Sequence, residues 1–316
     1  MRFGALFTSI LNKRKIEKEV EILDFRKVTP EDKDWIKDRL AVDKFYGAEY
    51  CFSSLLHWQE NYNTTITRFE DFAVVRSGWK QASYCYFGSG DRRALMAALE
   101  QEAQQRGEEL HFHSIMEKEK QILEELFPGK FIFEESRDSF DYCYTQEKLS
   151  ELRGRKLSSK RNHINRFVSL YSDWNYEAMT KENIPDCKAM LLDWYRSREE
   201  ATGESLDNEK RAIFTAMEHF DEEEIIGGLL RVEGKVIAFT MGHPVRKDVI
   251  VVHFEKADMD YPGSYQMINQ QFAKNSCRQF HLMNREEDMG IENLRKSKLS
   301  YEPDELLVKY SATLAK

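Results

Sequence analysis

The chain has 316 residues, a length that fits two domains of about 150 residues each. Hydrophobic residues make up 41% and charged residues 32%, which is typical of a globular protein and excludes a disordered one. The net charge of -8 disfavours a general polyanion-binding protein, and no apolar run approaches the ~18 residues of a membrane span.

The cysteines and histidines do not form a metal-binding pattern. No two cysteines have the CxxC spacing, and His111 and His113, two positions apart in a predicted strand, have no third ligand nearby in sequence. We therefore expect a reduced, cytoplasmic protein without a metal site, in which the thiols are small buried groups. The five cysteines are Cys51, Cys85, Cys143, Cys187 and Cys277.

Residues 1–20 are predicted to be a peripheral arm, and residues 21–150 a first domain. The apolar periodicity and the turn residues predict its elements in chain order. These are a strand at 21–27, helices at 30–41 and 50–62, strands at 64–69, 72–76 and 82–87, a helix at 91–106, a strand at 110–115, a helix at 117–127, and strands at 131–134 and 141–145.

Residues 171–316 repeat nearly the same order of elements. We expect a strand at 174–179, helices at 180–200 and 207–220, strands at 225–232, 236–243 and 249–254, a helix at 261–275, a strand at 280–283, a helix at 286–297 and a strand at 306–310. The repeat predicts two domains of mixed α/β and α+β class. A basic, helical linker at 151–170 joins them, and we expect an extensive interface between them.

Several motifs carry a resemblance to a known family. They are FSSLLHW at 52–58, the basic linker at 152–167, FEKAD at 254–258, YPGSY at 261–265, NREEDMG at 284–290 and LRKSKLSY at 294–301. Together they resemble the phosphatidylglycerol lysyltransferase C-terminal domain family, which is related to the Fem-type aminoacyltransferases. The repeated element order also resembles the tandem GNAT architecture.

The resemblance implies a transferase that moves an acyl or aminoacyl group from an activated ester or thioester to an amine or a hydroxyl. Family members move lysine from lysyl-tRNA to phosphatidylglycerol, which implies aminoacyl-tRNA as the donor. The GNAT fold implies acyl-coenzyme A as the other candidate donor. A non-catalytic GNAT pair that binds a small cationic ligand or a nucleotide is the alternative, and an open cleft distinguishes the transferase from it.

Ionisable groups gather where strands of the second half end. Glu255 or Asp258 is a candidate general base for an attacking ammonium, and Tyr301 or Tyr265 is a candidate acid for the leaving group. Glu286 and Asp288 are candidates for holding a cationic acceptor or the amino group of an aminoacyl donor. Glu287 is expected to be a solvated residue at a helix start, where acids are favoured in any case.

The helix start at 261–265 is a candidate anion site for a cofactor. In GNAT enzymes the coenzyme A pyrophosphate lies at this helix start, where Tyr261, Gly263, Ser264 and Tyr265 would surround it. Arg295 and Lys298, which share a helix face, are further candidates for binding phosphate. The alternative is an ordinary helix N-terminus in which Pro262 supplies the helical φ angle.

The linker concentrates positive charge and is a candidate RNA-binding helix. The alternative is a connector that is held by the acidic domain surfaces. The candidate RNA contacts are Arg153, Arg155, Lys156, Lys160 and Arg161, and we expect an exposed basic face.

We expect the candidate groups of the second half to converge on one cleft. If the strands before 255 and 286 are parallel neighbours, both loops leave the same edge of the sheet. The groups are Glu255, Asp258, Tyr265, Glu286, Asp288, Arg295, Lys298 and Tyr301.

Overall fold

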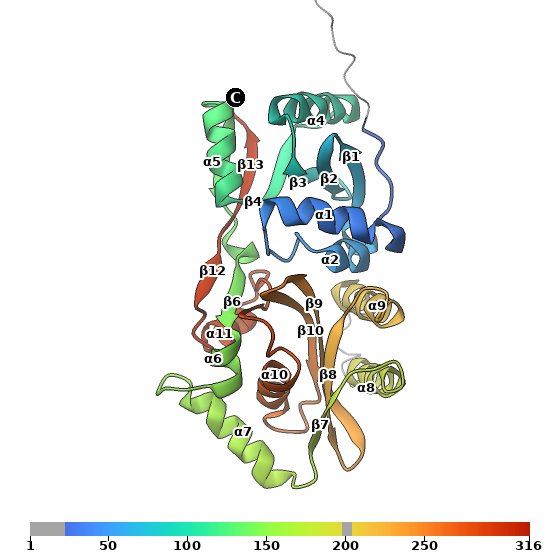
Figure 1. The fold of residues 1–316 in the computed structure, drawn as a ribbon, viewed down its shortest axis with the longest axis vertical. Coiled ribbons are helices and arrows are strands. Elements are labelled where there is room, and N and C mark those ends of the chain that lie inside the picture. The colour runs from blue at the N-terminus through green and yellow to red at the C-terminus, as the bar shows by residue number, and fades with distance from the viewer. Residues whose placement is uncertain (1–22, 198–203) are drawn as a thin grey trace, which may run out of the picture.

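The computed structural model describes residues 23–197 and 204–316, and it contains two mixed β-sheets, one above the other in Figure 1. The upper sheet has the strand order β1-β2-β3-β4-β13-β5. Its strands are β1 (Thr65–Phe69), β2 (Asp71–Ser77), β3 (Ser83–Ser89), β4 (His111–Met116), β5 (Phe131–Glu135) and β13 (Lys309–Leu314).

Three helices lie next to the upper sheet: α1 (Lys33–Asp43), α4 (Arg92–Arg106) and α5 (Glu117–Leu126). Local chemistry sets the ends of α4. The Asp91 carboxylate accepts hydrogen bonds from two backbone N–H groups of the first turn, and Gly107 ends the helix in the left-handed conformation. Buried aromatic residues such as Phe72, Tyr86 and Phe112 fill the space between sheet and helix.

The lower sheet has the order β12-β6-β11-β10-β9-β8-β7. Its strands are β6 (Asp141–Thr145), β7 (Asn175–Ala178), β8 (Ile226–Val232), β9 (Lys235–Arg246), β10 (Val249–Ala257), β11 (Leu282–Asn284) and β12 (Glu305–Leu307). In Figure 1, α8 (Ile184–Arg196) and α9 (Glu204–Glu218) lie on one side of this sheet, and α10 (Ser264–Asn275) lies on the other. The fold is therefore mixed α/β and is built on two mixed sheets.

Helix α6 (Gln146–Glu151) lies just before the linker and α7 (Ser158–Leu170) lies within it, and both pack against α10. The remaining short elements are η1 (Pro30–Asp32), α2 (Phe52–His57), α3 (Gln59–Tyr62), η2 (Arg137–Ser139) and α11 (Glu292–Leu299). Helix α2 contacts α9, so the interface joins the aromatic segment of the first domain to the second.

The two sheets do not divide at the boundary that we predicted. Strand β6, which we assigned to the first domain, pairs with β11 and β12 in the lower sheet. The predicted strand at 306–310 is two strands. Strand β12 stays in the lower sheet, whereas β13 runs up to pair with β4 and β5 (Figure 1). Each sheet therefore takes one strand from the other half, because pairing between distant segments decides which sheet a strand joins.

Other predicted bounds also differ. In the described part of 21–27 only an isolated bridge between Arg26 and Ile66 forms. The predicted helix at 50–62 breaks at Trp58 into α2 and α3. Helix α11 begins at Glu292, because residues 286, 289 and 290 adopt positive φ angles and form a loop. The predicted arm at 1–20 and the end of the predicted helix at 180–200 lie outside the described residues.

Candidate active site between the two domains

The site begins where two parallel strands separate. Strand β10 pairs with β11 only from Val249 to Val251, and the ladder of β10 with β9 is irregular around His253. Beyond this point β10 continues to Ala257, while the chain after β11 enters the loop at 285–291. The parallel arrangement that we expected is therefore present, and the divergence opens space at the sheet edge that faces the first domain.

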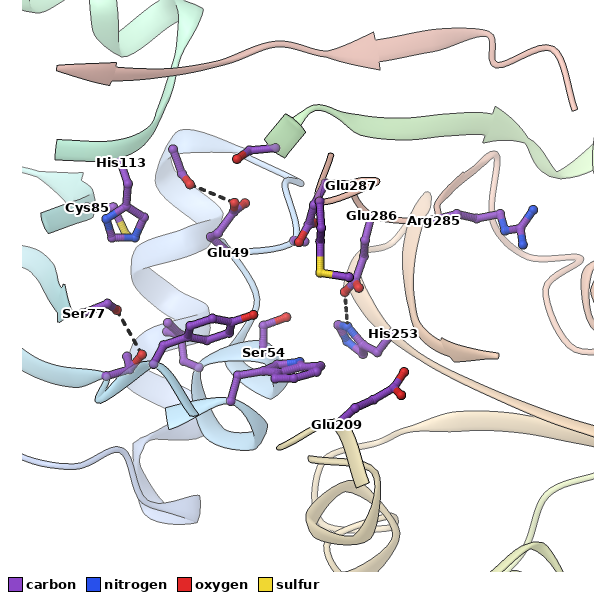
Figure 2. A pocket seen from close by; sticks show the side chains of 18 of the residues that line it. Glu49, Ser54, Ser77, Cys85, His113, Glu209, His253, Arg285, Glu286 and Glu287 are labelled. Carbon is purple, nitrogen blue, oxygen red and sulfur yellow. Dashed lines mark hydrogen bonds and ion pairs between the residues drawn. The ribbon is translucent and has the colours of Figure 1, made fainter. Parts of the chain in front are cut away.

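A cavity of about 670 Å³ occupies this space and is lined by both domains. Figure 2 shows Glu49 and His113 of the first domain on one side and Glu286 and Glu287 of the second on the other. The ionisable lining residues are Glu49, Tyr62, Cys85, His113, Glu209, His253, Glu255, Tyr265, Arg285, Glu286, Glu287 and Lys298. With five glutamates against two strong cations, the cavity is acidic.

Two ion pairs cross the gap between the separating strands. Glu255 accepts from Arg285 at 3.0 Å, and Glu286 accepts from His253 at 2.8 Å. Burial alone would lower the pKa of His253, but Cys51 and Glu286 raise this pKa to about 10. This shift favours the charged imidazole, which is the partner of Glu286.

Two further glutamates are also paired. Glu49 accepts from the Ser114 hydroxyl at 2.8 Å and from Lys309, and Glu209 accepts from Lys256 at 2.7 Å. Four of the five carboxylates therefore already have a cationic partner within the protein.

Glu287 is the exception. Its carboxylate has no hydrogen bond or ion pair with any residue in the described ranges. Burial and the neighbouring carboxylates of Glu286, Glu49 and Asp141 raise its pKa to about 8, although Lys309 acts in the opposite direction. Sequence alone placed Glu287 at a solvated helix start, and this is wrong because the loop at 285–291 turns it into the cavity.

Lys298 holds this loop in place. Its ammonium group donates to the backbone carbonyls of Arg285, Glu286 and Glu287, which uses all three N–H donors. Burial lowers the pKa of Lys298 to about 8, and Glu286 and Glu287 partly offset this effect. Lys298 lines the cavity as we expected, but its donors are occupied and it positions the acidic loop instead of presenting a free cation to phosphate.

Asp288 and Arg295 anchor the other end of the loop, and neither lines the cavity. Asp288 is fully buried and accepts from Arg295, from the Tyr142 hydroxyl and from the N–H of Gly290. Burial opposes ionisation, but these donors hold the pKa of Asp288 well below its usual range. The expectation that both residues reach the cleft is wrong, because they are bonded to each other behind it.

The start of α10 is packed rather than open. Gly263 has a φ of +96°, and a Cβ atom there would meet the His163 carbonyl oxygen of α7 at 2.5 Å. The Ser264 hydroxyl donates to the Asp258 carbonyl, and the Tyr261 ring lies 5.2 Å from that of Tyr171. None of the residues 258, 261, 263 and 264 lines the cavity, so the predicted anion site faces α7 and two acids.

Tyr301 also lies outside the cavity lining, with 4% of its surface exposed. Its ring lies between the Lys160 ammonium at 4.2 Å and the Arg285 guanidinium at 5.1 Å. Tyr265, the other candidate acid, does line the cavity. Half of the eight groups expected to converge therefore do so: Glu255, Tyr265, Glu286 and Lys298.

The linker is only partly an exposed basic face. The prediction is wrong for Lys160, which is buried against Tyr301 because α7 packs on the second domain. Arg161 donates to the carbonyls of Leu152 and Gly154. Arg153, Arg155 and Lys156 are exposed, and two of them pair with acids: Arg153 with Glu147 and Glu151, and Lys156 with Glu302.

Sequence reasoning missed the contribution of the first domain. Glu49, Trp58 and Trp79 line the cavity, and none of the three was among the candidate site residues. Arg285, which was not among the candidate site residues, lines the cavity, and its Nη1 is buried without a hydrogen-bond partner in the described part of the chain. The only available signal was the density of polar groups at 284–287.

The arrangement has the parts that acyl transfer needs. An enclosed polar space holds reactants together, a carboxylate with a raised pKa can bind or accept a proton from an ammonium group, and Arg285 offers an N–H donor near the separating strands. None of the helices within 23–197 and 204–316 is both long and apolar enough to cross a membrane.

Comparisons with known proteins agree with this architecture. A structure of a conserved protein of unknown function from Bacteroides thetaiotaomicron is 35% identical, with a TM-score of 0.87 over 93% of this chain and 100% of that one. The C-terminal domain of a putative lysylphosphatidylglycerol synthetase from Agrobacterium fabrum shares the fold, with a TM-score of 0.62 at 14% identity over 90% of this chain and 93% of that one.

A curated, uncharacterized protein of Mycoplasmoides gallisepticum is 27% identical over 184 residues, which are 54% of this chain. The alignment spans 55% of that relative's length. The sequence model of one family, described as phosphatidylglycerol lysyltransferase, C-terminal, matches residues 41–313. The chain therefore belongs to this family.

Proposed function

We propose that this chain transfers a cationic aminoacyl group of the lysyl class from an aminoacyl-tRNA to an amine or hydroxyl acceptor. The observation that carries the proposal is Glu287, an unpaired carboxylate in an acidic cavity between the domains. A cavity of this size also favours a transferase over a degenerate binding module, in which side chains would fill the space. The family description supports a lysyl group as cargo.

Coenzyme A is the less favoured donor. Its pyrophosphate needs free N–H groups at a helix start, but the start of α10 packs against α7 at Gly263. Asp258 and Asp260 precede this turn and would repel phosphate. An ester-linked RNA donor needs no pyrophosphate site there.

The charge on Glu287 makes the proposal specific. At pH 7 the carboxyl group is largely protonated, because its pKa is raised to about 8. A bound side-chain ammonium would lower this pKa, so binding should release a proton and become tighter as the pH rises towards 8. Glu255, held by Arg285 across the strand gap and by Asn269 of α10, is the candidate general base for the attacking group.

The test compares lysine amide with norleucine amide, which has the same α-amino group but no side-chain ammonium. In a thermal-shift assay, lysine amide at about 100 times its Kd should stabilise the protein by about 2.7 kcal/mol. Norleucine amide should give no shift, and Glu287→Gln should abolish the response to lysine amide. Equal shifts with both amides would contradict the cationic cargo.

Transfer itself is measured with radiolabelled lysyl-tRNA. Label should move to an amine, a hydroxyl compound or phosphatidylglycerol vesicles in the presence of the parent protein, and Glu287→Gln should fail. Acetyl-coenzyme A serves as the competing donor. Transfer from acetyl-coenzyme A but not from lysyl-tRNA would overturn the proposal.

A further inference from the structure

An unusual tryptophan lies at the rim of the cavity. Trp79 lines the cavity and yet is 70% exposed, so it stands where the cavity meets solvent. Tyr62 of the same domain (52% exposed) and Met289 of the other (56% exposed) also line it. The mouth of the acidic cavity therefore has an aromatic and apolar rim from both domains.

The Trp79 ring differs from the other tryptophan rings, because it has no aromatic or cationic partner among the described residues. The chain has five tryptophans, and the other four each have a ring or cation partner: Trp35 with Arg68, Trp58 with Tyr62 and Phe254, Trp174 with Phe167, and Trp194 with Lys256 and Tyr195. Among residues 23–197 and 204–316, no such partner lies over the Trp79 ring.

The ring is nevertheless held in place. Its Nε1–H donates to the Asn61 carbonyl at 2.9 Å, and the N–H of Gly78 donates to the Tyr62 carbonyl at 2.8 Å. Gly78 has a φ of +117°, and a Cβ there would meet the Gln81 carbonyl oxygen at 2.1 Å, so the turn requires glycine. An exposed indole fixed by its edge presents a rigid flat surface.

Two exposed cations are connected to Trp79, one along the chain and one through hydrogen bonds to Asn61, which accepts from the indole. Lys80 follows Trp79 and is exposed. The Asn61 side chain donates to the Asn208 carbonyl of α9, and Arg211, which is exposed, donates to the Asn208 side chain. Neither cation lines the cavity, so both positive charges lie outside its acidic interior.

We propose that Trp79 is the stacking platform for the terminal nucleobase of an RNA donor, with Lys80 and Arg211 facing the phosphate that precedes this nucleoside. This inference rests on the proposed function, because an aminoacyl group inside the cavity places its ribose, and hence the attached base, at the mouth. Every nucleobase has a flat π-face that stacks on an indole, and the cations suit an RNA backbone.

The test uses two stable probes that differ only in the nucleoside. One is lysine amide, and the other is 3′-lysylamino-3′-deoxyadenosine, in which an amide replaces the ester. The parent protein should bind the nucleoside probe about tenfold more tightly, and the adenine should quench the fluorescence of Trp79. Trp79→Ala should bind both probes equally, and Trp79→Phe should keep most of the preference.

The phosphate contacts need a longer probe. Adding a 5′ cytidylyl residue to the nucleoside probe should tighten binding further, and Lys80→Ala with Arg211→Ala should remove only this second gain. The unfolding midpoint of each variant should match that of the parent, since the replaced side chains are exposed.

Glu287→Gln separates the two proposals, because it should weaken both probes alike. If the parent binds both probes equally and Glu287 is needed for each, the platform is refuted and the proposed function stands. If the preference for the nucleoside survives in Trp79→Ala, the base lies elsewhere and the platform is refuted as well. Binding of phosphatidylglycerol vesicles that depends on Trp79, without a nucleoside preference, would mark the rim as a lipid contact and overturn the inference. If the parent binds neither probe, both proposals fail.

Discussion

Two loops of the second domain look alike in sequence and differ in the structure. The segment 258–263 follows β10 and the segment 285–291 follows β11, and each brings acids and a glycine to a helix start. The first is packed against α7, and its glycine sits against a backbone carbonyl. In the second loop, Lys298 donates a hydrogen bond to the Glu287 carbonyl, and the Glu287 side chain lines the cavity.

The difference shows that a helix start becomes a site only if the neighbouring elements leave it open. Helix α7 closes the loop after β10, whereas the first domain stands away from the loop after β11 and leaves a cavity. Substitutions in the two loops should therefore separate stability from ligand binding.

The largest effect is expected for Glu255→Gln. The side chains of Glu255 and Arg285 are 15% and 12% exposed, so the variant leaves a buried guanidinium without its counter-charge. Chemical denaturation should show a loss of about 3 kcal/mol, and turnover should fall as well. The matched control is Asp258→Asn, whose carboxylate accepts from the N–H of Asp260 outside the cavity. Equal losses of stability in Glu255→Gln and Asp258→Asn would contradict the proposed difference between the two loops.

Gly263→Ala should destabilise the protein by roughly 2 kcal/mol without weakening lysine amide binding to the folded protein. The variant combines a left-handed φ with a close contact to the His163 carbonyl. Gly154→Ala isolates the first effect, because Gly154 has a φ of +88° and a Cβ atom there would meet nothing within 4 Å. Coenzyme A binding to the parent that is lost in Gly263→Ala at unchanged stability would restore the anion site.

Unlike Glu255→Gln and Gly263→Ala, which destabilise the protein, Glu287→Gln should stabilise it above neutral pH, by roughly 0.5–2 kcal/mol. The folded carboxyl group keeps its proton up to about pH 8, compared with an ordinary pKa of 4.5. The folded state therefore binds more protons in this window, so stability falls as the pH rises through it, and glutamine removes that loss. Denaturation at pH 5 and pH 8 measures the difference. Glu292→Gln, at an exposed position, serves as the control. A gain in stability that does not depend on pH would contradict the burial of the Glu287 carboxyl group.

The smallest effect on stability is expected in the linker. Arg153, Arg155 and Lys156 are exposed, and ion pairs there contribute under about 1 kcal/mol. If they contact RNA, replacing all three by alanine should weaken every tRNA alike and flatten the salt dependence of binding. Alanine at Lys118, Lys181 and Lys247, exposed elsewhere, is the matched control. An equal decline in both triple variants would show only a general charge effect.

Local chemistry made much of the fold predictable. The helix cap at Asp91, the stop at Gly107 and the alternation of β2 and β3 depend on neighbours within a few residues. The division at residue 308 between β12 and β13 depends instead on strands more than 150 residues away, and no local pattern records that pairing.

The site was less predictable than the fold for the same reason. Glu255 and Glu286 could be found because they follow strands that proved to be parallel neighbours. Glu49 and Trp79 could not, because their role comes from the approach of another domain. Burial of Lys160 likewise depends on how α7 lies on Tyr301, which a count of linker charges does not reveal.

The exchange of strands has a consequence for how the protein is made. Strand β13 lies between β4 and β5, so the upper sheet has a gap until residues 309–314 have been synthesised. Domains usually fold as units while the ribosome is still producing the rest of the chain. Here β5 has no neighbour to pair with before β13 arrives, so the first domain must wait for the second, and a chain released before residue 309 would expose two unpaired strand edges.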